Sequence, residues 1–257
     1  MRHTWRLREN AKLTSLWKFQ FVTIRPKKLN PQITRRLLKG ASNFNIISEK
    51  LRWITEQFLG KPYIIWPLIG SEETSEQFTA TYDTFDCVTY LETCLALAWA
   101  KNVDEVDNLL CEIRYRNGNV KWEDRLHYTT DWSKYHVKRG AFQDITRGED
   151  TLSRTKEINF LKCFKPRSIT FRYFPKRKLK KISKNFRDGD LIYFASTRKG
   201  LDTFHVGFLF WVDDKLVMRH SAKSKGGVVE QELADFVKVN TMPGFIVTRP
   251  NEFLPRP

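Results

Sequence analysis

The sequence has little cysteine, and its four cysteines, at positions 87, 94, 111 and 163 of 257 residues, include no C-x-x-C pair. This spacing argues against a structural zinc site and against a disulfide framework. The chain also lacks any stretch with the length and purity of a transmembrane helix. A secretory signal is missing as well, because the apolar run over residues 13–24 contains Lys18 and Gln20 and lacks a small-residue cleavage site. We therefore expect a cytoplasmic protein, with export to the periplasm or outside by a non-standard route as the alternative.

Acidic residues are almost absent from two segments of the chain. Residues 1–39 hold 11 Lys and Arg with one acidic residue, and residues 160–187 hold 11 Lys and Arg with none. Since the whole chain carries a net charge of +16, the remainder is slightly acidic. Such segments suit an anionic partner, such as nucleic acid, a membrane surface or a carboxylate-rich polymer. They equally suit a solvated surface or a flexible tail.

The most informative stretch, residues 82–92, joins an extended lead-in to an apolar helix, with Cys87 at the junction. Apolar residues from Val88 to Trp99 fall at helical spacing and Asp86 is a good cap, which predicts a helix from Cys87 to Ala100. Free N–H groups and the positive dipole end in its first turn favour a thiolate. With a histidine partner, the pKa of such a thiol falls by several units from about 8.5. Cys87 is thus placed like a nucleophile, although a cysteine in an apolar helix is more often a small core residue.

Two further helices are predicted around this one. The first begins with Ser42 as its cap, runs to Leu59 and ends at Gly60. The second runs from Val103 to Cys111. Farther along, residues 169–174 alternate apolar and polar side chains, which predicts a strand with one polar face.

Three strands are predicted near the C-terminus, over residues 191–194, 205–212 and 215–220. Asp213 and Asp214 supply a turn between the last two, which therefore form a hairpin. His205 begins one strand of this hairpin and His220 ends the other, so we expect the two rings to lie close together. Such a pair can act as a general base and its orienting partner, whereas a single histidine is more often structural.

The stretch over residues 113–132 is dense in aromatic and charged residues. Loops of this composition line binding sites, because their side chains both stack and form hydrogen bonds, or they simply cover cores. Arg114, Arg116 and Arg125 could bind carboxylates in a bidentate manner. A solvated surface is the competing interpretation.

Five short blocks follow one another along the chain: Gly60-Lys61-Pro62-Tyr63, Phe85-Asp86-Cys87, Gly189-Asp190-Leu191, His205-Val206-Gly207 and His220-Ser221-Ala222. In this order they resemble the NlpC-type, papain-like peptidoglycan hydrolases. Two more blocks are similar to the N-acetylmuramoyl-L-alanine amidase-like branch of that superfamily: Ile113-Arg114-Tyr115-Arg116-Asn117-Gly118 and His127-Tyr128-Thr129-Thr130-Asp131-Trp132. The resemblance covers roughly residues 50–240.

The resemblance implies an α+β, papain-like NlpC-type fold, in which the helix that carries the nucleophile packs on a small antiparallel sheet that bears the histidines. We accordingly divide the chain into a basic N-terminal extension, residues 1–41, and a papain-like catalytic domain, residues 42–257. A basic insertion lies around residues 145–187 of this domain. The chain departs from the family in its missing secretion signal, in the basic 160–187 region and in Val88, where many relatives have a small polar residue.

The resemblance also implies roles for individual residues. Cys87 matches the nucleophile, His205 the general base and His220 the polar group that orients the base. Tyr63 matches a tyrosine near the thiolate, and the backbone N–H of Cys87 is the natural oxyanion donor. The candidate substrate-binding residues are Tyr63, Asp86, Arg114, Tyr115, Arg125 and Trp132.

The predicted function is that of a bacterial cysteine amidohydrolase, which cuts either the muramoyl–L-alanine amide or a bond within the stem peptide of peptidoglycan. The expected partner is a peptidoglycan or muropeptide substrate, and an anionic surface could contact the basic segments. The mechanism needs no metal or organic cofactor, and no nucleic acid is obligatory. One alternative is a basic nucleic-acid-binding protein, and the other is an inactive papain-like scaffold that binds cell-wall fragments.

Overall fold

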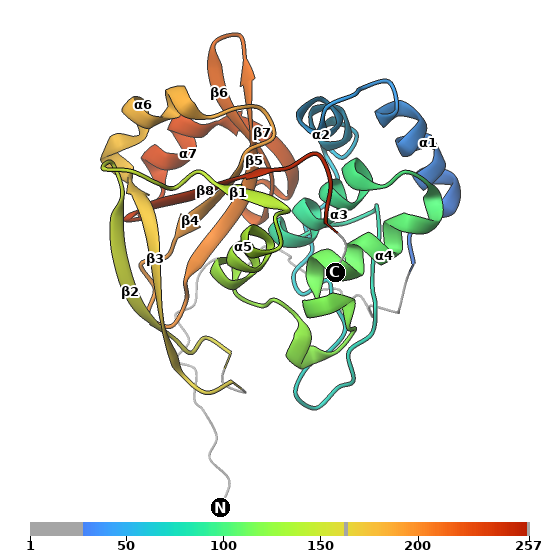
Figure 1. Cartoon of the computed structure of the whole chain (residues 1–257), viewed down its shortest axis with the longest axis horizontal. Helices are drawn as coiled ribbons and strands as arrows, with labels where there is room; N and C mark the ends of the chain where they lie inside the picture. The colour runs from blue at the N-terminus through green and yellow to red at the C-terminus, as the bar shows by residue number, and fades with distance from the viewer. Residues whose placement is uncertain (1–27, 162–163, 256–257) are drawn as a thin grey trace, which may run out of the picture.

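The computed structural model describes residues 28–161 and 164–255. Figure 1 shows the first helices on one side of the molecule and an antiparallel sheet on the other. The longer helices are α1 (Pro31–Ala41), α2 (Ile47–Glu56), α3 (Cys87–Trp99), α4 (Val103–Arg114), α5 (Thr129–Lys138) and α7 (Leu233–Val239), and α6 (Leu179–Ile182) is a single turn. Within the described part of the chain, no helix combines the length and apolar character that crossing a membrane requires.

The sheet has the strand order β2-β3-β8-β4-β5-β6-β7, and β1 pairs with β8 beside this path. All of its strand pairs are antiparallel. The strands are β1 (Phe142–Asp144), β2 (Leu152–Ile158), β3 (Arg167–Pro175), β4 (Leu191–Ala195), β5 (Thr203–Val212), β6 (Lys215–Ala222), β7 (Gly227–Glu232) and β8 (Gly244–Pro250). Helices combined with an antiparallel sheet make this an α+β fold, as predicted.

Helix α3 begins and ends close to the predicted positions. The Asp86 side chain accepts hydrogen bonds from the N–H groups of Val88 and Thr89, and Thr89 returns one to the Asp86 N–H, which completes a capping box. Every residue from Thr89 to Trp99 is buried, so the helix is enclosed on all sides and has no single apolar stripe. Its neighbours α2, α4, β5 and β6 provide this enclosure.

The sheet has an apolar core on each of its faces. On one face α3 packs against β5, with the rings of Tyr90 and Phe208 6.0 Å apart in an edge-to-face contact. On the other face α7 covers β4, with Phe194 and Phe236 4.5 Å apart. Helix α3, which begins with Cys87, therefore packs on one face of the sheet as predicted. Helix α7 forms a further layer on the opposite face.

The predicted helix over residues 42–59 is shorter than expected. Ser42 follows α1 and caps its C-terminus, and α2 begins only at Ile47, after an N-cap residue, Ile46, that makes no side-chain hydrogen bond. A serine can satisfy backbone groups at either end of a helix, so its identity alone did not decide which end it occupies. The later predicted helix from Val103 is confirmed and continues to Arg114.

The N-terminal region enters the core earlier than the division at residue 41 implied. Residues 1–27 lie outside the described residues, whereas Leu29, Leu37 and Ala41 are buried in the same core cluster as α3. The region expected as a basic insertion forms the β2–β3 hairpin and α6. β3 joins the main sheet at two residue pairs, Phe174 with Phe245 and Pro175 with Gly244.

The β5–β6 hairpin is confirmed, with Val212 paired to Lys215 across the turn. Its two turn residues, Asp213 and Asp214, have φ values of 47° and 60°. Positive φ at both central positions is the type I′ arrangement, which matches the twist of paired strands. The hairpin thereby fixes the register that places His205 and His220 on neighbouring strands.

Candidate active site

Cys87 is the first residue of α3 and is partly exposed. The backbone N–H of Val206, the residue that follows His205 in β5, favours the thiolate form of Cys87. The residue pairs between β5 and β6 stop at Phe208, although both strands continue beyond it. Beyond that point Val206 stays paired with Tyr193 of β4, and His220 of β6 stays paired with Val229 of β7.

A second contact holds the start of α3 against the same strand ends. The hydroxyl of Ser221, next to His220 in β6, donates a hydrogen bond to the carbonyl of Phe85 at 2.9 Å. Both groups are buried, so this bond has no competition from solvent. Ser221 belongs to one of the recognised sequence blocks, but its role depends on a contact across more than a hundred residues and was not predicted.

The two histidines are in direct contact. His205 Nε2 and His220 Nδ1 are 2.5 Å apart, and the rings meet edge to face with their centroids 4.7 Å apart. A β-bulge in β5 precedes His205, opposite Phe194 and Ala195. Bulges re-aim side chains and are frequent beside active sites. The expected proximity of the two rings is therefore confirmed.

Phe236 of α7 supports both histidines. Its ring stacks on His205 with a centroid distance of 5.4 Å and meets His220 edge-on at 5.5 Å. Sequence reasoning missed this residue, because nothing local to α7 indicates which side chains of the sheet it covers. The contact restricts the orientation of both imidazoles.

Tyr63 approaches the same thiol from a separate segment. Its backbone N–H bonds to the Gly226 carbonyl at 2.8 Å, and the Val228 N–H bonds to the Lys61 carbonyl at 2.8 Å, which ties the segment to β7. A Cβ at Gly227 would lie 2.4 Å from the Lys61 carbonyl oxygen, so the close approach requires glycine at that position. Burial, and after it the negative charge of Cys87 and Asp86, raises the pKa of Tyr63 to about 12.

The pKa of Cys87 moves in the direction opposite to that predicted. Burial and then the Asp86 carboxylate raise the pKa of the thiol to about 12, against the opposing effect of the Val206, Cys87 and Val88 N–H groups. The helix N-terminus does favour the thiolate, but the cost of burying the charge is larger. At neutral pH the resting group is therefore a thiol.

The histidine pair is neutral as well. Burial, followed by the positive charge of His220, lowers the pKa of His205 to about 3. Burial is also the main cause that lowers the pKa of His220 to about 4. The thiol and both imidazoles are thus uncharged at neutral pH. Among the described residues, no group of three or more His, Cys, Asp and Glu side chains is placed to hold a metal ion.

The model of the AmiA-like, N-acetylmuramoyl-L-alanine amidase-like family matches residues 53–245, about three quarters of the chain. The chain belongs to this family. No curated protein matches the sequence at a significant level. The matched range contains Tyr63, Cys87, His205 and His220.

Two solved structures of similar shape support the fold. A protein of Legionella pneumophila has a TM-score of 0.74 and 23% identity, covering 85% of this chain and 94% of its own. An N-acetylmuramoyl-L-alanine amidase from Bacteroides uniformis has a TM-score of 0.65 and 24% identity, covering 86% of this chain and 99% of its own. At these identities the likeness shows the shared fold alone.

Arg114 of this AmiA-like protein is a structural residue. It is only 2% exposed, and it donates hydrogen bonds to the Glu92 carboxylate at 2.7 Å and to the Thr79 carbonyl at 2.8 Å. Glu92 is equally buried. A guanidinium with this partner has no free face for a substrate carboxylate, which corrects the predicted binding role.

Tyr115 and Trp132 are also committed to the interior. The buried Tyr115 hydroxyl bonds to Glu76 at 2.6 Å, and the indole N–H of Trp132 donates to the Ile113 carbonyl at 2.8 Å. Neither side chain lies in the cluster around Cys87. These two predictions are likewise corrected, because aromatic and charged residues of this stretch cover the core and do not line the site.

Arg125 is held by protein partners but also lies beside a cavity. Arg125 forms a two-bond pair with Glu76, in which Nε lies 3.0 Å from the carboxylate, and stacks 4.6 Å above Trp122. It still borders a cavity of about 270 Å³ together with Arg116.

The carboxylate of Asp86 is occupied by its capping bonds, which confirms the helix-cap role and leaves little capacity for substrate.

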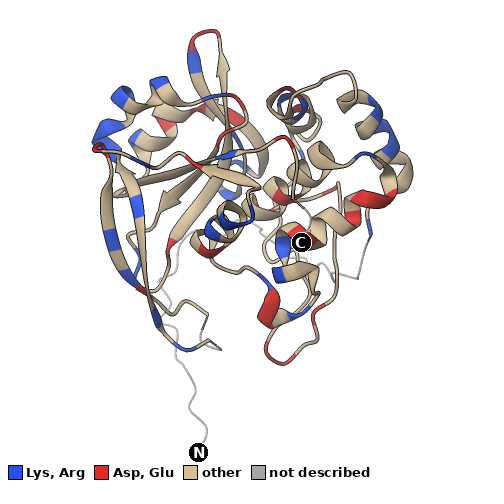
Figure 2. Cartoon of the chain, in the orientation of Figure 1, with Lys and Arg blue, Asp and Glu red and all other residues tan. Residues whose placement is uncertain are grey.

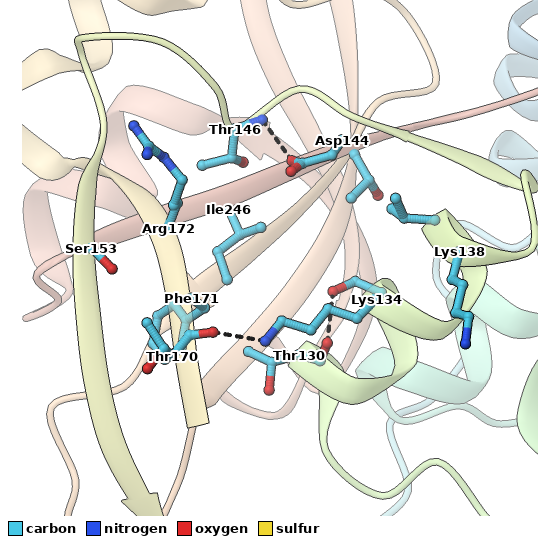
Figure 3. A pocket seen from close by; sticks show the side chains of 13 residues that line it. Thr130, Lys134, Lys138, Asp144, Thr146, Ser153, Thr170, Phe171, Arg172 and Ile246 are labelled. Carbon is cyan, nitrogen blue, oxygen red and sulfur yellow. Dashed lines mark hydrogen bonds between the residues drawn. The ribbon is translucent and has the colours of Figure 1, made fainter. Parts of the chain in front are cut away.

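A larger cavity of about 360 Å³ lies elsewhere, between α5 and the strands β3 and β8 (Figure 3). None of its lining residues comes from α3 or β5. The Lys134 ammonium at its edge is bonded to the Thr170 carbonyl at 2.7 Å. The candidate active site is therefore the Cys87 cluster and not this cavity.

Proposed function

We propose that this AmiA-like protein is a cysteine amidohydrolase that cleaves an amide bond of peptidoglycan or of muropeptides. The observation that carries the proposal is the placement of the Cys87 thiol at the start of α3, against the strand residue next to His205. The bonded His205–His220 pair supplies a base with an orienting partner. We assign the arrangement to the papain-like, NlpC-type mode of catalysis.

The reaction begins from a neutral pair. In this state the Nε2–H group of His205 donates a hydrogen bond to His220 Nδ1. The other ring nitrogen of His205, Nδ1, is then free to accept a proton. As the Cys87 sulfur attacks the amide carbon, its proton passes to His205. The tetrahedral intermediate then expels the amine, which takes that proton from His205, and a thioester remains on Cys87. Water hydrolyses the thioester with His205 again as the base.

The same positions serve to stabilise the oxyanion. The backbone N–H of Cys87 lies in the first turn of α3, where it has no partner within the helix. Cys87 lies close enough to Tyr63 to raise the pKa of its phenol, which is therefore neutral and available as a second donor. One such donor is worth about 3 kcal/mol in the transition state.

The test is mass spectrometry of defined muropeptides incubated with the wild-type protein and with Cys87→Ala. Release of a free stem peptide that starts at L-alanine identifies a muramoyl–L-alanine amidase, and release of shorter peptides identifies an endopeptidase. Cys111→Ala is the matched control, because Cys111 is also partly exposed but lies on α4, away from the histidines. We expect the control to cleave like the wild type.

Two results would contradict the proposal. If the wild type and Cys87→Ala both leave every muropeptide unchanged while folded, the protein is not this hydrolase. If Cys87→Ala retains wild-type cleavage, the nucleophile is another group. In the first case, binding of cell-wall fragments by an inactive scaffold becomes the next function to test.

A further inference from the structure

A cationic surface lies at the opposite edge of the sheet from β7. Residues 176–187, the cationic ridge, contain seven Lys and Arg and no acidic residue. They form α6 and the 3-10 turns on either side of it. Figure 2 shows Lys and Arg gathered over α6 and continuing along the β2–β3 hairpin on the outer side of the molecule.

The ridge separates its apolar and charged side chains. Ile182 and Phe186 are buried in the core cluster beneath α7, and Leu179 packs beside them. Arg177, Lys180, Lys181, Lys184 and Arg187 are exposed. The fold therefore fixes the backbone of the ridge through its apolar residues while its charges face solvent.

Few of these charges are neutralised inside the protein. In the described part of the chain, the ion pairs of the ridge go to one carboxylate, Asp150, which binds Lys178 at 2.7 Å and Lys181 at 2.8 Å. An exposed cluster of like charge attracts ions of the opposite sign and raises their local concentration. The surface is thus complementary to an array of anionic groups.

We propose that the cationic ridge docks the protein on an anionic phospholipid membrane. Its cations are mostly lysines, which act as point charges and suit a fluid array of phosphates. Its aromatic residue, Phe186, is buried, so it offers no stacking platform for the bases of a single strand. Leu152, which begins β2 just after Asp150, is 46% exposed and can enter the headgroup region.

The docking surface is separate from the candidate active site. In the sheet, β8 and β4 lie between β3, which leads into the ridge, and β5, which carries His205. Docking through the ridge therefore leaves the Cys87 cluster uncovered. The inference does not depend on the reaction that the protein catalyses.

The test is cosedimentation of the full chain with phosphatidylcholine vesicles, with and without phosphatidylglycerol. The ridge variant is Arg177→Gln/Lys180→Gln/Lys184→Gln, which spares both lysines bonded to Asp150. The control is Arg35→Gln/Arg36→Gln/Lys39→Gln, which removes three exposed cations from α1. Each cation near an anionic membrane contributes about fivefold in affinity, so we expect the ridge variant to bind about 100-fold more weakly and the control to bind like the wild type.

Several outcomes would overturn the proposal. Equal losses in the ridge variant and the control would show that net charge alone drives binding. Unchanged binding of the ridge variant would place the contact on another surface, and no preference for phosphatidylglycerol would exclude electrostatic docking. If duplex DNA binds more tightly than anionic vesicles at equal ionic strength, and the ridge variant loses that binding, the ridge serves nucleic acid instead.

Discussion

The Cys87 cluster and the Arg114–Tyr115 region both contain buried titratable side chains, but the partners of these side chains differ. Around Arg114, the side chains of Arg114, Tyr115 and Arg125 are each bonded to a carboxylate, either that of Glu92 or that of Glu76. In the Cys87 cluster, the two histidines bond to each other, and no carboxylate among the described residues forms an ion pair with either of them. Paired carboxylates and cations of this kind stabilise the fold, whereas a buried titratable group is a candidate for function where a second titratable group or a nucleophile lies beside it, as in the Cys87 cluster.

The comparison predicts that His205→Ala affects activity and leaves stability nearly unchanged. Loss of the general base should lower kcat for muropeptide cleavage by about 10⁴-fold, the upper end of what such a group contributes. Removing a partly exposed imidazole that is unfavourable to protonate should change the unfolding midpoint little. Denaturant unfolding and single-turnover kinetics on one preparation measure both effects. An inactive variant that has also unfolded would show that His205 is needed for stability, as Arg114 is.

The reverse is expected of Arg114→Ala. Removing the cation leaves the Glu92 carboxylate buried without its ion-pair partner, which typically costs about 3–5 kcal/mol of stability. Cleavage per folded molecule should remain near that of the wild type. Arg116→Ala is the matched control, because Arg116 is exposed on the neighbouring turn. A fall in kcat without a change in the unfolding free energy would return Arg114 to the substrate-binding residues.

His220→Ala and His220→Asn separate an orienting role from a purely structural one. Without a partner for its Nε2–H, His205 loses its fixed orientation, and we expect kcat to fall by about 10²-fold, the lower end of the contribution of a general base. Asparagine retains an acceptor near that position and should restore part of the rate. If the asparagine variant is no more active than the alanine variant, although both are folded, His220 does not act by accepting this bond.

Local signals in the sequence were sufficient to predict α3, its cap and the β5–β6 hairpin, because each depends on residues a few positions apart. The burial of Arg114 was not predictable in this way, since its partner Glu92 lies on a different helix. The predicted lowering of the Cys87 pKa was wrong for a related reason. The helix N-terminus is visible in the sequence, but the burial that outweighs it comes from elements far along the chain.

The last and smallest effect, expressed per pH unit, concerns His136, a buried histidine of α5 that lies outside the Cys87 cluster. Its Nε2 bonds to the Ile113 carbonyl at 2.9 Å, its Nδ1 has no partner among the described residues, and burial lowers its pKa to about 4. Between pH 6.5 and 4 the unfolded chain binds a proton at this position and the folded chain does not. Stability is therefore fully present above pH 6.5 and is lost as the pH falls, by about 1.4 kcal/mol per pH unit.

His136→Phe keeps a ring among Trp132, Tyr135 and Phe142 but removes the titration. The histidines at 127, 205 and 220 also have lowered pKa values, and both proteins retain them, so the difference in slope reports His136 alone. We expect urea unfolding at a series of pH values to give a shallower pH dependence for the variant by this amount. Equal slopes would mean that His136 accepts its proton in the folded state, and that its surroundings tolerate charge as the Cys87 cluster does not.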